Sequence, residues 1–163
     1  MVIRQRGFSL VELIVVVAIM GILLGVAAPS FSEWVASQLV RDTAADLHSS
    51  LTRARSEAIS RGLATTVTAV SGNLANGWYI ANPDSGFNPD AANPTIFVEQ
   101  HGAVNNATIS GATNVTFTNI GHLSGSAIGI KIAVSGTSQT RCVTVDTAGR
   151  PKTRVINASD SCS

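Results

Sequence analysis

The sequence lacks the short patterns by which many enzymes are recognised. It contains no G-x-S-x-G nucleophile elbow and no glycine-rich loop of the kind that cradles a phosphate. Its three histidines, His48, His101 and His122, lie in unrelated segments and show no metal-ligand spacing. Neither sign of charge dominates, since 11 basic residues oppose 10 acidic ones, and this balance does not by itself indicate a nucleic-acid-binding protein. We therefore predict no catalytic residues, no cofactor and no metal site.

Charge is also scarce in the N-terminal part, where an apolar run extends from Phe8 to Ala28. As a helix that rises 1.5 Å per residue, this run would span about 30 Å, which is the thickness of the hydrocarbon core of a bilayer. Arg4 and Arg6 precede the run with no acidic residue beside them, and such charges hold the N-terminal end on the cytoplasmic side. Residues 8–28 are therefore predicted to form a transmembrane helix.

One acidic residue, Glu12, interrupts the apolar run near its start. A carboxylate in hydrocarbon costs roughly 2.5–3.5 kcal/mol on insertion scales, so an ionisable residue there indicates a function and a partner of opposite charge. The small residue Gly7 lies before the run, whereas the cleavage site of a secretory signal peptide follows its apolar region. Cleavage after Gly7 would leave the apolar helix on the mature protein.

The stretch RGFSLVEL resembles the processing site of type IV prepilins and of type II secretion pseudopilins. The resemblance implies that a prepilin peptidase removes residues 1–7 as a leader peptide, cutting between Gly7 and Phe8, and that Phe8 is then methylated. It also implies that Glu12 faces the N-terminal ammonium of a neighbouring subunit in a filament. Two buried opposite charges would offset part of each other's desolvation cost. The alternative is a generic signal anchor.

Beyond Pro29, which lacks a backbone N–H and would bend a continuing helix, the pattern becomes amphipathic. Residues 29–62 are predicted to continue the helix and to pack on a sheet, with a coiled-coil seam as the alternative. Gly62 is the expected C-cap residue, because glycine adopts a left-handed conformation at little cost. The charged faces are interpreted as solvated, with local ion pairs such as Arg53 with Glu57. The apolar stripe comprises Val40, Ala44, Leu47, Leu51, Ala54 and Ala58.

Residues 63–163 change to the alternating pattern of strands and are predicted to form a β-rich domain. Strands are expected at 63–70, 78–81, 95–100, 114–119, 127–134 and 140–145. The intervening segment 82–94 is rich in proline and is predicted to be a polar loop, since Asp84 and Asp90 do not match the spacing of an EF-hand calcium site. A long N-terminal helix that packs on an antiparallel sheet gives an α+β fold.

Three further stretches are similar to the GspH/FimT group of minor pilins and pseudopilins. They read RARSEAISRG at 53–62, FTNIGHLSG at 117–125 and CVTVDTAGRPKT at 142–153. The resemblance implies the type IV pilin fold, in which the first half of the long helix is transmembrane and the second half packs on the sheet of a periplasmic domain.

The only two cysteines are Cys142 and Cys162. Because the N-terminus independently implies export, we predict a structural disulfide formed in an oxidising compartment; the alternative is two free thiols in the cytosol. The bond would close a loop of about 20 residues and stabilise the domain by about 3 kcal/mol. No C-x-x-C spacing supports a redox-active pair.

A local basic group near the C-terminus comprises Arg141, Arg150, Lys152 and Arg154. Some FimT-type minor pilins bind DNA through a Gly-Arg-x-Arg motif in this part of the chain during natural transformation, and the resemblance implies double-stranded DNA as a possible partner. At 149–152 this chain reads Gly-Arg-Pro-Lys, and the lysine keeps the charge but lacks the planar fork of arginine. Such contacts would be salt-sensitive and independent of sequence. The alternative is a solubilising turn, since no aromatic stacking platform is evident.

Together these features predict a minor pilin, a structural subunit that is incorporated in or primes a type IV pilus, at its tip. Two alternatives stay open, which are a DNA-binding minor pilin for natural transformation and a type II secretion pseudopilin. The expected partners are other pilins or pseudopilins, the prepilin peptidase and the lipid of the inner membrane. The chain would be a single-pass inner-membrane protein with its C-terminal domain in the periplasm, and it would later join a filament.

Overall fold

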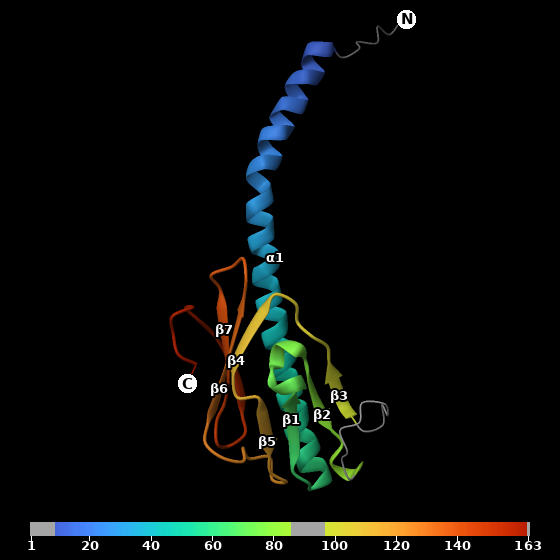
Figure 1. Ribbon diagram of the computed structural model, residues 1–163, viewed down its shortest axis with the longest axis vertical. Coiled ribbons are helices and arrows are strands. Elements are labelled where there is room, and N and C mark those ends of the chain that lie inside the picture. Colours follow the sequence, from blue (N-terminus) through green and yellow to red (C-terminus); the bar gives the residue numbers. More distant parts are fainter. Residues whose placement is uncertain (1–8, 86–96, 163) are drawn as a thin grey trace, which may run out of the picture.

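The computed structural model describes residues 9–85 and 97–162, and its dominant element is one long helix, α1 (Leu10–Arg61). The helix begins after Ser9, whose side chain accepts a hydrogen bond from the backbone N–H of Glu12 and so satisfies one of the donors that a helix N-terminus leaves unpaired. It ends at Gly62, which has φ 65° and confirms the expected left-handed C-cap. The first half of α1 projects beyond the second half and the strands, which together are here called the head (Figure 1).

The second half of α1 carries the apolar stripe into the core of the head. Helical spacing of three and four residues puts these side chains on one face, and that face is covered by strands. The prediction of packing on a sheet is therefore confirmed, in place of a coiled-coil seam. Fully buried stripe residues are Val40, Ala44, Leu47, Leu51, Ala54 and Ala58.

Eight described strands follow the helix and pair into two antiparallel sheets. The first sheet has the order β3-β2-β1-β5 and the second has the order β4-β6-β7-β8. The bounds are β1 (Thr65–Ala69), β2 (Trp78–Ala81), β3 (Phe97–His101), β4 (Ala107–Gly111), β5 (Asn114–Phe117), β6 (Ile128–Val134), β7 (Thr140–Val145) and β8 (Pro151–Ile156). Short 3-10 helices, η1 (Val70–Gly72), η2 (Leu74–Asn76) and η3 (Pro83–Ser85), lie in the connections around β2.

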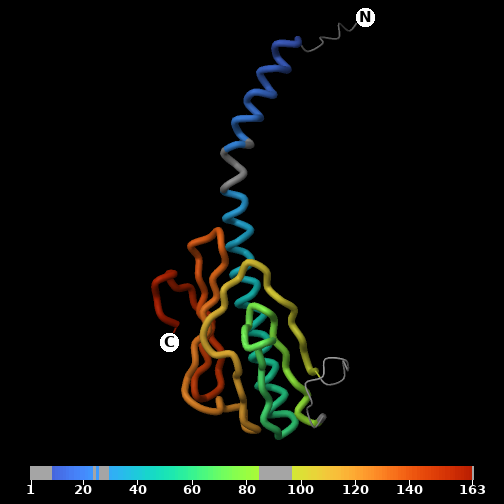
Figure 2. The backbone as a smooth tube through the Cα atoms, in the orientation of Figure 1, coloured from blue at the N-terminus to red at the C-terminus, as the bar shows by residue number. Residues whose placement is uncertain are grey.

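The core lies where both sheets meet α1. The helix contacts β1 and β5 of the first sheet and β6, β7 and β8 of the second (Figure 2). The largest fully buried side chains come from all three sources: Trp78, Phe117 and Ile80 from the first sheet, Ile130 and Ile132 from the second, and Leu47 and Leu51 from α1. Burial alternates along β6, where Ile130, Ile132 and Val134 point to the core, whereas β7 buries Val143 and Val145 in the core and Cys142 on its other face.

Two strands, β4 and β8, are absent from the sequence-based expectation. The β8 segment reads PKTRVI, in which charged residues and a leading proline hide the strand pattern. Proline is tolerated at the first residue of a strand, and β8 is an edge strand, so few of its side chains need to be apolar. The β4 segment, ATISG, is another edge strand with a single buried residue, Ile109. Both strands are recognised through their pairing partners rather than through their composition.

The bend expected at Pro29 concerns a residue whose side chain lies outside the described part of the chain, and it stays a prediction. The same holds for the loop residue Asp90 and for the cleavage position between Gly7 and Phe8.

Candidate functional site

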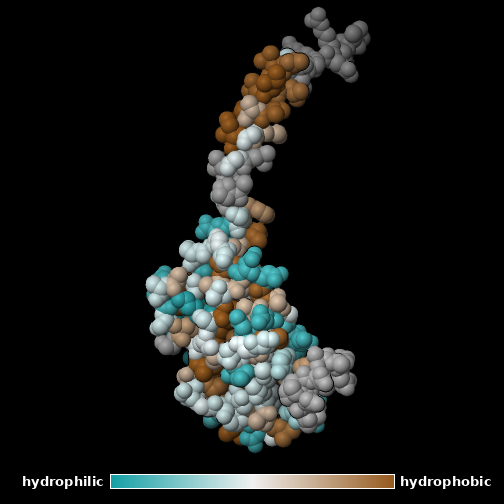
Figure 3. All heavy atoms as spheres, in the orientation of Figure 1, coloured by the Kyte–Doolittle hydropathy of each residue, from teal (hydrophilic) through white to brown (hydrophobic). Residues whose placement is uncertain are grey.

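The first half of α1 presents apolar side chains to its surroundings. Their exposed fractions range from 44% at Val16 to 74% at Leu10. Figure 3 shows these apolar atoms gathered along the projecting part of the helix, in contrast to the mixed surface of the head. Exposed apolar patches of this extent mark a protein or membrane interaction surface. The projecting half is therefore the first candidate functional surface.

Within the described residues, no helix is long and apolar enough to cross a membrane.

Glu12 lies in the first turn of α1, three residues after the cap residue Ser9. The backbone N–H of Glu12 donates to Ser9 Oγ at 3.3 Å, so the pair has the S-x-x-E spacing of a capping box. A carboxylate in the first turn also interacts favourably with the positive end of the helix dipole. The sequence reasoning missed this local role, although the S-x-x-E spacing was its signal. Pairing of Glu12 with a neighbouring ammonium stays a prediction.

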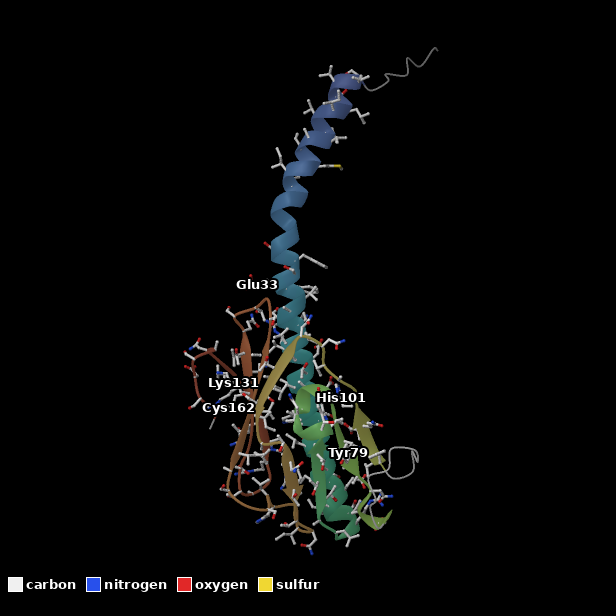
Figure 4. The ribbon with its side chains drawn as sticks, viewed as in Figure 1. Glu33, Tyr79, His101, Lys131 and Cys162 are labelled. Atoms are coloured by element: carbon white, nitrogen blue, oxygen red, sulfur yellow. A yellow bond between two sulfur atoms is a disulfide. The ribbon has the colours of Figure 1, made fainter. Side chains whose placement is uncertain are left out.

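The predicted disulfide is confirmed. It holds the C-terminal segment 157–162 against the outer face of the second sheet, which is the face that points away from α1. Cys142 on β7 is fully buried and bonds to Cys162, with their Cα atoms 5.5 Å apart. The Lys131 ammonium on β6 donates to the backbone carbonyls of Ala158 and, at 3.1 Å, of Asp160. Figure 4 shows Lys131 and Cys162 side by side on this face. The segment is thus fastened at two points.

Gly129 on β6 explains how closely that segment approaches the sheet. A Cβ atom at this position would lie 1.8 Å from the carbonyl oxygen of Cys162. Only glycine leaves room for the backbone there, because any side chain would displace the segment.

The structure does not bring the four basic residues of the C-terminal part together. Arg154 is paired with Cys142 and Lys152 with Thr144, so both share the outer face of the second sheet. Arg141 precedes Cys142 and points to the opposite face, because successive side chains alternate. There it lines a groove of about 330 Å³ beside α1, together with Arg41 and His48.

Arg150 has a different role, in the turn between β7 and β8. Its backbone N–H donates to Asp146 Oδ1 at 2.9 Å, and its guanidinium Nε donates to Asp146 Oδ2 at 2.9 Å. The first of these hydrogen bonds, and then the second, lowers the pKa of the Asp146 carboxyl below its ordinary value. The arginine of the Gly-Arg stretch therefore closes its own turn.

Gly149 in the same turn has φ 73°, and a Cβ atom there would lie 2.0 Å from the carbonyl oxygen of Gly121. Arg55 on α1 donates from Nε to the same carbonyl at 2.9 Å. The three stretches that carry the GspH/FimT resemblance thus meet at Gly121, although they are far apart in sequence. Their shared residue pattern serves the packing of the head.

Lys152 and Arg154 line a depression of about 530 Å³ on the second sheet, together with Ala127, Ile128 and Val145. Asp146 also lines it and reduces its net positive charge. This depression is a second candidate surface.

Ser50, Asp46 and His101 lie near each other and have the composition of a hydrolase triad, but their hydrogen bonds differ from one. Ser50 Oγ accepts from Trp78 Nε1 at 2.9 Å and donates to the Glu99 carboxylate, while His101 pairs with Asp46 at 3.3 Å. The three residues fasten the first sheet to α1. Within residues 9–85 and 97–162, no group of three or more His, Cys, Asp or Glu side chains is placed to hold a metal ion.

Two family models match the chain. The model described as type II transport protein GspH matches residues 43–149, which is more than half of the chain. The model described as the prokaryotic N-terminal methylation motif matches residues 3–28. The first match runs from the second half of α1 to the turn before β8, and the second match ends at residue 28, within the first half of α1.

Two crystal structures of the type IV minor pilin FimU from Pseudomonas aeruginosa PAO1 have a similar fold. One superposes with a TM-score of 0.57 at 23% identity and covers 76% of this chain and 99% of FimU. The other superposes with a TM-score of 0.58 at 22% identity and covers 76% of this chain and 95% of FimU. At these identities the likeness establishes the fold, a long N-terminal helix on antiparallel sheets. The chain belongs to the GspH family and is a minor pilin or pseudopilin of the GspH/FimT type, with the type IV pilin fold.

Proposed function

We propose that the chain is a minor structural subunit of a type IV pilus, held in the inner membrane by the first half of α1 until it joins the filament near its tip. The observation that carries this proposal is the contrast between the head, which buries its own core, and the projecting half of α1, which leaves its apolar side chains exposed. That half needs other partners, first lipid and then the helices of neighbouring pilins. Helices in lipid associate through close van der Waals contact.

Maturation would precede assembly. The prepilin peptidase would cut between Gly7 and Phe8, Phe8 would be methylated, and the head would lie in the periplasm. The match to the N-terminal methylation motif supports this order of events. Mass spectrometry of the chain from its native filament tests it, with a methylated Phe8 terminus as the expected result. An intact Met1, or a chain without the apolar half of α1, would refute it.

Glu12 would then pair with the N-terminal ammonium of a neighbouring subunit. Glu12→Ala should leave the monomer inserted and folded but impair its incorporation into filaments. Glu12→Gln is the matched control for shape, since the glutamine amide has nearly the same size, can still form hydrogen bonds and lacks the charge. Impaired incorporation of both variants supports charge pairing, whereas impairment of the alanine variant alone assigns the role of Glu12 to the size and hydrogen bonding of its side chain rather than to its charge. Normal incorporation of both would end the pairing model.

Binding of double-stranded DNA is the first alternative, and one observation favours a narrower form of it. Lys152 and Arg154 share one face of the second sheet, at the depression described above, while Arg141 lies on the other face and Arg150 closes a turn. In a gel-shift assay across a salt series, K152A/R154A should therefore bind DNA more weakly than the unchanged chain, whereas R141A should bind it equally well. If K152A/R154A binds DNA as tightly as the unchanged chain, a DNA site on this face is contradicted.

A type II secretion pseudopilin is the second alternative, and the GspH description of the matching family favours it. The architecture is the same in both systems, so the distinction rests on phenotype. A deletion strain that loses piliation supports the pilus, and one that loses protein secretion while keeping its pili supports the secretion system.

A further inference from the structure

The two tryptophans of the chain, Trp34 and Trp78, have opposite surroundings. Trp78 is fully buried, stacks on His101 with ring centroids 3.9 Å apart, and donates its indole N–H to Ser50. Trp34 lies on α1 with 58% of its surface exposed. Within the part of the chain that the structure describes, its indole N–H donates to no acceptor. A large apolar ring with an unused donor is unusual on a surface that faces only water.

Trp34 belongs to a small aromatic face of α1. Phe31 is 65% exposed and stacks on Trp34 with ring centroids 6.0 Å apart. Val35, one turn further than Phe31, extends the same face and is also exposed. Positions three and four residues apart lie side by side on a helix, so these three side chains form one continuous patch. The head begins immediately beyond it, since Ser37 and Val40 are already buried.

The position of the patch along the chain suits the headgroup layer of a bilayer. If the run from Phe8 to Ala28 fills the hydrocarbon core, Phe31 and Trp34 lie about 4.5 and 9 Å beyond its end, at 1.5 Å per residue. The headgroup layer is roughly 5–8 Å thick on each side of the core. Helical side chains also lean toward the N-terminus of their helix, which brings both rings back toward the lipid. The two rings therefore fall within the headgroup layer.

We propose that Phe31 and Trp34 form an interfacial anchor that binds the periplasmic headgroup layer of the membrane and fixes the depth of α1 before assembly. The occupant is a phospholipid surface, because the indole combines an apolar ring with a donor that phosphate and ester oxygens can accept, and tryptophan is enriched at such interfaces. Because Ser37 and Val40 follow directly, the anchor also holds the head against the membrane surface. The inference rests on the proposed transmembrane segment, and its test separates the two.

The test uses the full chain in phosphatidylcholine vesicles that carry a quencher either at the headgroup or deep in the acyl chains. Trp34 fluorescence is obtained by subtracting the signal of W34F, in which only the buried Trp78 remains. Headgroup quenching of Trp34 is expected to exceed deep quenching several-fold. In a W34F background, Met20→Trp places a probe in the middle of the apolar run and should show the reverse order. Ile59→Trp, at the head end of α1, should respond to neither lipid quencher.

Each outcome has one meaning. Trp34 quenched mainly by the headgroup label, with Met20→Trp quenched mainly by the deep label, supports the anchor. If Met20→Trp behaves as expected but Trp34 is quenched by neither lipid label or mainly by the deep one, the anchor is wrong and the transmembrane segment stands. If neither probe is quenched by lipid, the transmembrane segment fails and the anchor fails with it.

Discussion

The two halves of α1 share one helical backbone but are stabilised in opposite ways. The second half buries its stripe against two sheets, so its geometry is fixed within a single chain. The first half exposes nearly the same kinds of side chain and gains nothing from the head. Burial of an apolar side chain contributes about 1.5–3 kcal/mol. That free energy is already used in the second half, whereas in the first it is still available for association with lipid or other subunits.

The test with the largest expected effect replaces one leucine in each half of α1. Leu47→Ala removes a fully buried side chain and should lower the free energy of unfolding of the head by about 2–5 kcal/mol. Leu13→Ala, at a position that is 62% exposed, should change it by less than about 0.5 kcal/mol. Denaturant unfolding in detergent, followed by near-ultraviolet circular dichroism, measures both. Similar losses for the two variants would mean that the first half also packs within the chain.

The next test removes the constraint that exists only in the head. The C142S/C162S variant should lose about 3 kcal/mol of stability, since it opens the loop between two cysteines that are 20 residues apart in sequence. Reduced wild-type protein is the matched control and should unfold at the same midpoint as the double variant. An unchanged midpoint in both would show that segment 157–162 is held without the disulfide.

Two glycines give a smaller contrast of opposite sign. Gly149→Ala places a side chain at φ 73° and against the Gly121 carbonyl, which should destabilise the head by about 1–3 kcal/mol. Gly21→Ala meets no atom within 4 Å and should strengthen α1, because alanine has the higher helix propensity by about 1 kcal/mol. Thermal melts of the head and the helical circular dichroism signal report the two effects. A stable G149A head would show that the turn relaxes without cost.

The smallest expected effect concerns acid. The pKa of Asp146 is lowered in the folded head, first by the backbone N–H of Arg150 and then by its guanidinium. Its contribution is therefore fully present above the unfolded pKa of about 3.9 and is lost as the pH falls through the lower folded value. Asp146→Asn keeps an acceptor for Arg150 and should weaken the dependence of the melting temperature on pH in that range. An unchanged pH profile would remove Asp146 as a contributor.

Patterns with a clear period were readable from the sequence. The stripe from Val40 to Ala58, the cap at Gly62 and the disulfide are confirmed, because each depends on local spacing or on a unique pair of cysteines. The edge strands β4 and β8 were missed because edge strands need few apolar residues. The division of the strands into two sheets was missed for the same reason, since β4 and β8 both belong to the second sheet.

Contacts between distant segments were not readable in this way. Glu57 pairs with Arg61 rather than with Arg53, because Arg53 reaches Glu99 on β3 at 3.4 Å. Arg53 and Arg61 each lie four residues from Glu57, so sequence spacing does not distinguish them. The contact of Arg53 with Glu99 does. The basic group near the C-terminus was divided for a similar reason, since strand alternation sends Arg141 and Arg154 to opposite faces once β8 is known. Spacing alone gave no sign of which face each would take.

The disulfide has a consequence for the quality of newly made chains. Cys162 follows β8, the last strand described, so translation reaches it only after all eight described strands have been made. A chain that stops between β7 and Cys162 therefore keeps Cys142 as a thiol without its disulfide partner. A thiol-reactive label applied to the unfolded chain therefore distinguishes chains that contain the disulfide from fragments that stop before Cys162.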